Sequence, residues 1–189
     1  MSTDDDLTPW EPPLAGSDAE HLVGSLDRMR WTFRWKAGGL DADQLNRRVG
    51  ASSLTLGGLL KHLTQVEAIK FTWDLDGSNP GEPWASLDEG REEDHDWAFV
   101  SAAADTPEDL YAAYDATVAR ARERLSEAIR DGGLDQVVHL GQVWGLDVSL
   151  RRLLHDVVEE YARHTGHADL LREAVDGLVG EDPPEGWRP

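Results

Sequence analysis

Apolar residues recur at helical spacing in four long stretches of the chain. In the first stretch they follow one another at steps of four, three and four residues from Leu22 to Phe33, which places them on one face of an α-helix. Ser17 and Glu20 precede this stretch at the spacing of a capping box. We therefore expect a first helix that begins after Ser17 and ends at the glycines of residues 38–39.

The second stretch is apolar on nearly all sides. Thr55 is a suitable N-cap, and LGGLLKHLTQVEAIKFTW follows it as far as Trp73. A helix without a polar face is typical of the centre of a bundle. We therefore expect a second, central helix that begins near Thr55 and ends near Trp73.

Two further helices are predicted in the second half of the chain. Residues 106–109, Thr-Pro-Glu-Asp, combine a capping hydroxyl, a proline at the first helical position and acids in the first turn. The third helix should reach about Arg130, before the Asp-Gly-Gly of residues 131–133. Residues 134–146 indicate short extended structure at most, and the fourth helix should run from Asp147 or Ser149 to near Gly177.

These four helices predict an all-α fold, a four-helix bundle. Prolines and glycines interrupt residues 76–84, so we expect residues 76–105 to form a long crossover connection between helices 2 and 3, with REEDHD as its most acidic part. The bundle should occupy residues 17–179. Residues 1–16 and 180–189 are proline-containing and are expected to be N-terminal and C-terminal tails.

Composition excludes several classes of function. The 37 acidic and 18 basic residues give a formal net charge of -19, which disfavours nucleic acid and anionic membranes as partners. No apolar run reaches the roughly 20 residues of a membrane span, and Met1–Asp6 lacks the features of a secretory signal, so a cytoplasmic location is expected. The chain has no cysteine, so any thiol chemistry must use a thiol from another molecule.

The fourth predicted helix carries several side chains of metal-ligand type in EEYARHTGHADLLRE, residues 159–173. At about 100° per residue, His164 lies about 40° from Glu160, and His167 lies about 20° from it on the other side. His155 falls on the opposite side of the helix. The apolar residues Leu153, Val157 and Leu171 share the arc of the first three, so we expect Glu160, His164 and His167 to face the core.

His62 on the second predicted helix also faces inward, because it shares its arc with Leu59, Val66, Ile69 and Trp73. Buried imidazoles and carboxylates are costly unless they are paired. A divalent metal bound by both helices would meet that need. Two other readings stay open: His62 as a hydrogen-bonded core residue, and Glu160 paired with Arg34 or Arg163. Glu67 lies off the arc of His62 and is predicted to form a structural ion pair.

LGGLLKHLTQVE, residues 56–67, and LLHDVVEEYARHTGHADLLRE, residues 153–173, resemble the two signature helices of the DinB-like four-helix metalloprotein superfamily. The resemblance covers about residues 18–178 and is closest to its actinobacterial branch. Members bind a divalent metal through a histidine on the second helix and two ligands on the fourth. Several resemble transferases or isomerases that use mycothiol or bacillithiol, including the mycothiol-dependent maleylpyruvate isomerase.

The resemblance implies that His62, Glu160 and His164 are the metal ligands, with zinc as the first choice and nickel or iron as alternatives. Many relatives have histidine at the position of Glu160, whereas the mycothiol-dependent isomerases have glutamate. His167 is interpreted as a neighbour of the ligands or an alternative ligand. The implied function is a metal-dependent S-transferase that uses mycothiol or a similar thiol as cosubstrate for a small-molecule electrophile.

Two rival functions remain open: a metal-dependent hydrolase at the same site, and a non-catalytic bundle that binds a metal or ligand. A homodimer is an expectation from the family alone. The site should open beside His62 and His164, with the connection of residues 76–105 as one wall. Trp84 and Trp97 in that connection either line the opening or cover the core.

Overall fold

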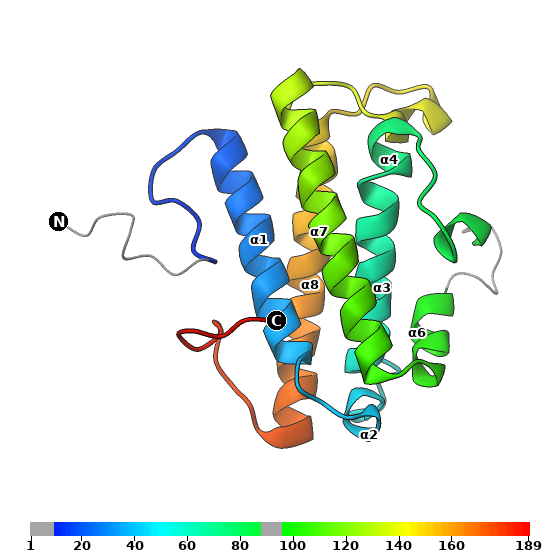
Figure 1. Cartoon of the computed structure of the whole chain (residues 1–189), viewed down its shortest axis with the longest axis vertical. Helices are drawn as coiled ribbons and strands as arrows, with labels where there is room; N and C mark the ends of the chain where they lie inside the picture. The colour runs from blue at the N-terminus through cyan, green and yellow to red at the C-terminus, as the bar shows by residue number, and fades with distance from the viewer. Residues whose placement is uncertain (1–9, 88–95) are drawn as a thin grey trace.

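The computed structural model describes residues 10–87 and 96–189, and this part of the chain is helical without a β-strand. Four long helices, α1 (Asp18–Ala37), α3 (Leu56–Lys70), α7 (Pro107–Gly132) and α8 (Leu150–Asp176), stand side by side (Figure 1). Helices α3 and α7 run in the same direction, so the chain between them returns along the outside of the bundle. The predicted all-α bundle with a crossover is confirmed.

Each long helix begins at a hydroxyl side chain that accepts a backbone N–H. Ser17 and Glu20 form the predicted capping box of α1. Thr55, Thr106 and Ser149 accept the N–H groups of the third residue after them. The predicted starts are therefore correct, because local side-chain chemistry determines them.

The predicted helix ends are less accurate. Helix α3 ends at Lys70, and Trp73 begins a separate short helix, α4 (Trp73–Asp76). The intervening Thr72 leaves the helical conformation, and its hydroxyl donates to the carbonyl oxygen of Ala68. Trp73 is therefore 45% exposed, and its predicted place on the inward arc of His62 is wrong. Helix α7 continues two residues past Arg130.

Short elements fill the connections. Helix α2 (Ala42–Leu45), which the hydrophobic pattern did not predict, has its own capping box from Asp41. The crossover contains η2 (Trp84–Ser86), α6 (Trp97–Ser101) and η3 (Ala102–Ala104), and α6 packs against α3. All of REEDHD except Asp96 lies outside the described residues. Residues 134–149 hold η4 (His139–Trp144) and one isolated bridge.

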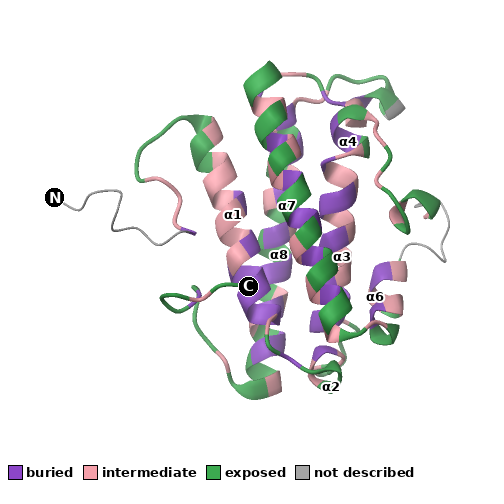
Figure 2. Cartoon of the chain, in the orientation of Figure 1, coloured by how far each residue is buried: buried purple, intermediate pink, exposed green. Residues whose placement is uncertain are grey.

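Buried apolar residues from all four long helices belong to one hydrophobic core, and Figure 2 marks buried positions on each of these helices. Two segments flank α1, residues 10–16 before it and residues 177–189 after α8, and each places a tryptophan on Trp31 of α1: Trp10 and Trp187, with ring centroids 5.7 and 5.6 Å away. Arg28 of α1 forms ion pairs with one acid from each segment, Glu11 and Asp182. Among the described residues, none of the helices is long and apolar enough to cross a membrane.

Candidate metal centre

Three of the predicted ligands lie together where α3 faces α8. His62 comes from α3, and Glu160 and His164 come from successive turns of α8. The candidate ligand atoms of these side chains all lie within 4.8 Å of one another. Residues about 100 positions apart in the sequence thus form one cluster, which we call the His/Glu/His cluster.

The carboxylate of Glu160 joins the two imidazoles. Its Oε1 lies 2.7 Å from Nε2 of His62 and 3.1 Å from Nε2 of His164. The four-residue spacing of Glu160 and His164 places both side chains on one face of α8, one turn apart. One oxygen therefore accepts hydrogen bonds from two helices, and both Nε2 atoms point toward the same small volume.

The cluster lies at the edge of the core and is partly open to solvent. His164 is 8% exposed, whereas the side chains of His62 and Glu160 are 19% and 33% exposed. Helical rotation predicted that these residues face the core, but it did not predict that their exposed fractions differ. The neighbouring Tyr161 on α8 is fully buried, so the cluster residues lie at the border of the buried face.

The histidines keep Glu160 ionised. Hydrogen bonds from His164 and His62 lower the pKa of the Glu160 carboxyl well below its ordinary value, although partial burial opposes this shift. A carboxylate that stays charged can serve as a metal ligand without first losing a proton. Protons would therefore compete with a bound metal for the two histidines and not for Glu160.

This arrangement predicts a pH effect on the metal-free protein. The unfolded chain takes up a proton at Glu160 near its ordinary pKa of 4.5, whereas the folded chain does so only at lower pH. The stabilising contribution is therefore complete above about pH 4.5 and declines below it. Urea unfolding at about pH 7, 4.5 and 3 should show a smaller acid loss in Glu160→Gln than in the wild type. Equal acid losses would contradict the hydrogen bonding described above.

The alternative prediction, an ion pair between Glu160 and Arg34 or Arg163, is wrong. Arg34 binds Asp115 at 2.8 Å, and Arg163 binds Glu159 at 3.2 Å. His155 is exposed on the opposite side of α8, as predicted. The hydrogen-bond partner of His62 is Glu160 itself, which leaves the polar groups of the cluster satisfied mainly by one another.

His167 lies beside the cluster. Its Nδ1 is 3.3 Å from Nδ1 of His164, and its side chain is half-buried. Burial, together with the positive charges of His164 and Arg163, lowers the pKa of His167. A neutral His167 can accept a hydrogen bond from the Nδ1–H group of His164, which fixes the orientation of that ring.

Phe99 of the crossover covers His62, a contact that the sequence did not reveal. The two rings are stacked, with centroids 4.7 Å apart and planes 23° from parallel. Gly58, one turn before His62, gives Phe99 room, since a Cβ there would lie 3.2 Å from the Phe99 ring. This stacking holds the His62 ring with its Nε2 toward Glu160.

The two tryptophans of the crossover pack against each other and not on the histidines. Trp84 and Trp97 have ring centroids 5.8 Å apart. The Lys61 ammonium lies 4.4 Å from the Trp97 ring and 2.6 Å from an oxygen of Asp105. Lys61 therefore holds the segment that carries Phe99 against α3.

A second polar group, fully buried, lies behind the cluster. Arg30 of α1 forms two parallel hydrogen bonds with Glu67 of α3, both 2.7 Å long, which confirms the predicted ion pair of Glu67. Tyr161 of α8 donates to Glu67, and Tyr114 of α7 lies 2.9 Å from the Tyr161 hydroxyl. Each long helix thus supplies one member of a network that fixes Tyr161, the neighbour of Glu160.

A family model described as mycothiol-S-transferase matches residues 21–177. The chain belongs to the mycothiol-S-transferase family. This membership agrees with the resemblance of its second and fourth long helices to the mycothiol-using branch of DinB-like proteins. No curated protein and no solved structure matches the chain.

The cluster fits a divalent cation in this mycothiol-S-transferase family member. Ligand atoms about 2.0–2.2 Å from a zinc ion stand about 3.3 Å apart in a tetrahedral site, close to the 2.7 and 3.1 Å between Glu160 Oε1 and the two histidine nitrogens. Two imidazoles and one carboxylate are also a donor set that suits zinc, nickel and iron. The three ligand atoms all lie within 4.8 Å of one another, so a cation bound by all three would require a rearrangement of these side chains alone.

Proposed function

We propose that the protein is a metal-dependent S-transferase that activates a low-molecular-weight thiol of the mycothiol type. The observation that carries the proposal is that one oxygen of Glu160 lies within hydrogen-bond distance of both His62 and His164. Three groups of metal-ligand type therefore meet at one partly exposed point. Membership of the mycothiol-S-transferase family supports the thiol class. The absence of cysteine supports a sulfur supplied by a cosubstrate.

His62, Glu160 and His164 would hold the cation, for which zinc is the first choice and nickel or iron are alternatives. A divalent cation held there would lower the pKa of a thiol, so that the thiol reacts as thiolate near neutral pH. Glu160 supplies negative charge without proton loss, and Phe99 and His167 keep the two imidazoles in orientation. Three protein ligands would leave one coordination position of such a cation free for a thiol.

The proposed reaction forms one carbon–sulfur bond. The thiolate sulfur attacks an electrophilic carbon, a leaving group departs with its bonding electron pair, and the thiol proton passes to solvent. The chain contributes orientation of the two reactants at the partly exposed cluster. The small-molecule thiol and the electrophile are therefore the partners that we propose for this site.

A thiol panel tests this function. Zinc-loaded protein is incubated with monochlorobimane and one thiol at a time: mycothiol, bacillithiol, glutathione or none. We expect conjugation with mycothiol only, with a loss of more than about 100-fold in His164→Ala and no change in His155→Ala, whose imidazole is exposed on the far side of α8.

The other outcomes of the panel identify the rival functions. Turnover that does not depend on thiol would indicate a metal-dependent hydrolase at the same cluster. Silence with all four conditions and several electrophiles would indicate a bundle that only binds a metal or ligand. Either result would reject the S-transferase proposal.

His167 provides a separate prediction. Replacement by leucine should weaken zinc binding by about 10–100-fold, because His164 loses the acceptor of its Nδ1 proton. Glutamine, whose carbonyl oxygen can accept the same hydrogen bond, should retain most of the affinity. Competition titrations with a chromophoric chelator measure both variants, and equal losses in the two would show that His167 acts by packing alone.

A further inference from the structure

The helices that carry the proposed metal ligands belong to two different packed pairs. Helix α8 packs mainly against α1, and α3 packs mainly against α7 and α6. The α3–α8 interface, across which His62 faces Glu160 and His164, is smaller than any of these three interfaces. The separation of the ligands therefore depends on the few groups that join α3 to α8 directly.

Two side-chain hydrogen bonds join α3 to α8 in the described part of the chain. One is the bond between His62 and Glu160 within the cluster, and the other is a bond of 2.7 Å from the Tyr161 hydroxyl to Oε1 of Glu67. A cation bound by His62 and Glu160 would take the place of the first bond. The Tyr161–Glu67 bond does not involve a candidate ligand, so it can hold the two helices at the same separation with and without the metal.

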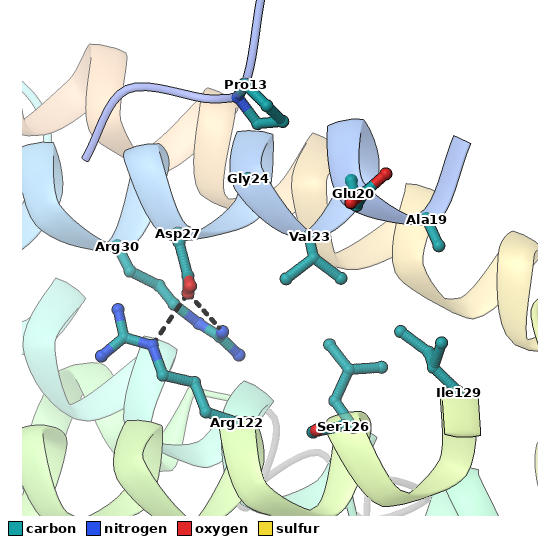
Figure 3. Close-up of a pocket in the computed structure, with 11 residues that line it drawn as sticks. Pro13, Ala19, Glu20, Val23, Gly24, Asp27, Arg30, Arg122, Ser126 and Ile129 are labelled. Carbon is teal, nitrogen blue, oxygen red and sulfur yellow. Dashed lines mark hydrogen bonds and ion pairs between the residues drawn. The ribbon is translucent and has the colours of Figure 1, made fainter. Parts of the chain in front are cut away.

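The Glu67 carboxylate is a fixed anchor for this bond. Its side chain is 0% exposed, and the guanidinium group of Arg30 binds both of its oxygens at 2.7 Å. The remaining terminal nitrogen of Arg30 donates to Asp27, which also accepts a hydrogen bond from Arg122 of α7 (Figure 3). Glu67 therefore cannot follow the Tyr161 hydroxyl if α8 moves away, and the bond opposes a change in helix separation.

Tyr161 transmits this constraint to the ligands through α8. It follows Glu160 directly and precedes His164 by three residues, which is less than one helical turn. Its ring is fully buried and lies edge-on to Phe33 of α1, with centroids 6.2 Å apart. Because a hydrogen-bonded helix is stiff over one turn, a fixed Tyr161 also fixes the backbone from which Glu160 and His164 extend.

We propose that the Tyr161 hydroxyl is a positioning group of the candidate metal centre. Its hydrogen bond to Glu67 sets the separation of α3 and α8 before the metal binds, so the cation does not have to draw the helices together. Such preorganisation raises affinity, because less binding energy is used to order the site. This role rests on the proposed function, since it concerns the same metal centre, and it adds a residue that touches neither the metal nor the thiol.

Two tyrosine variants separate positioning from general stability. Tyr161→Phe removes the hydroxyl that joins α3 to α8. Tyr114→Phe removes a second buried hydroxyl of the same network, 2.9 Å from that of Tyr161, but leaves the bond to Glu67 in place. Zinc affinity, measured by competition with a chromophoric chelator, should fall by about three- to tenfold in Tyr161→Phe and stay within about twofold in Tyr114→Phe. Urea unfolding measures the stability of both variants, so a loss of fold is detected separately.

Cobalt in place of zinc gives a readout that a purely structural role would not change. The visible absorption bands of bound cobalt depend on the arrangement of its ligands. We expect altered band positions and relative intensities in Tyr161→Phe and a wild-type spectrum in Tyr114→Phe. Wild-type zinc affinity with an unchanged cobalt spectrum in Tyr161→Phe would overturn the proposal, and so would the same changes in both variants.

The metal-free protein provides a separate readout. The hydrogen bonds of Glu160 depend on the helix separation, so the Nε2 NMR signals of His62 and His164 report it. In protein labelled at the histidine nitrogens, these signals should shift in Tyr161→Phe and keep their wild-type positions in Tyr114→Phe. Unchanged signals in Tyr161→Phe would contradict the positioning role.

Failure of the positioning role can be told apart from failure of the proposed function. A wild type that binds neither zinc nor cobalt would reject the metal-dependent function and this role with it. Metal binding in the wild type that is unaffected by Tyr161→Phe would reject the positioning role alone.

Discussion

Replacing Glu67 with glutamine should lower the free energy of unfolding by about 3–5 kcal/mol, the loss expected when one partner of a buried ion pair is removed. The side chains of Arg30 and Glu67 are 1% and 0% exposed. Burial alone would lower the pKa of Arg30, but the Glu67 carboxylate, with Tyr161 and Asp27, outweighs it and raises that pKa. An arginine side chain stays protonated in proteins even when it is buried, so the variant must bury a cation whose one remaining carboxylate partner is Asp27.

A matched exposed pair serves as the control. Glu159 and Arg163 on α8 are 70% and 60% exposed, so Glu159→Gln should change the unfolding free energy by less than about 0.5 kcal/mol. The double variant Arg30→Met, Glu67→Leu should recover much of the loss, since it removes both buried charges. Urea unfolding at neutral pH measures all three. A loss below about 1 kcal/mol in Glu67→Gln would show that the network does not hold the four helices together.

Zinc should stabilise the wild type by about 4 kcal/mol at a free concentration about 1,000 times its dissociation constant, and this effect should vanish in His62→Ala. His62 lies on α3, whereas the other two candidate ligands lie on α8. A cation held by all three joins two helices and binds the folded chain in preference to the unfolded one. Loss of His62 leaves only an i,i+4 pair on one helix.

His21 provides the control for this effect, because it is an exposed histidine on α1. Thermal unfolding with and without zinc compares His62→Ala and His21→Ala with the wild type. The second variant should keep the full zinc-dependent shift. Equal zinc stabilisation in all three proteins would place the ion elsewhere on this acidic chain.

Helix starts could be predicted from the sequence because they depend on a few adjacent residues. The Ser17 capping box and the cap at Thr106 are both present. The end of α3 was harder to predict, because its apolar pattern continues through Phe71, beyond the last helical residue, Lys70. The hydrogen bond from the Thr72 hydroxyl to the Ala68 carbonyl oxygen, which competes with the helix, is visible only in the folded chain. Helix α2 is too short for a periodic pattern.

The candidate site was predictable in part. Helical rotation places Glu160 and His164 on one face of α8, but it does not say which helix lies opposite. The approach of His62 depends on the packing of α3 against α8, which the family resemblance implied and residue spacing alone did not. Phe99 comes from the crossover, where no periodic pattern relates it to His62.

Glu67 shows the same limit for the core. Its position off the arc of His62 indicated an ion pair, but its partner is Arg30, 37 residues earlier on another helix. Tyr161 could have been recognised, because it follows Val157 by four residues and precedes Ala168 by seven, on the apolar stripe of α8. Its hydroxyl, however, finds a partner only when the bundle brings Glu67 to it.

The most direct test is a crystal structure of protein grown with zinc, with anomalous data collected on both sides of the zinc absorption edge. We predict one strong anomalous peak per chain, bonded to His62 Nε2, a Glu160 oxygen and His164 Nε2 at about 2.0–2.2 Å. A cluster that keeps its Glu160–histidine hydrogen bonds with no anomalous peak between them, or a peak bound at other residues, would contradict the account.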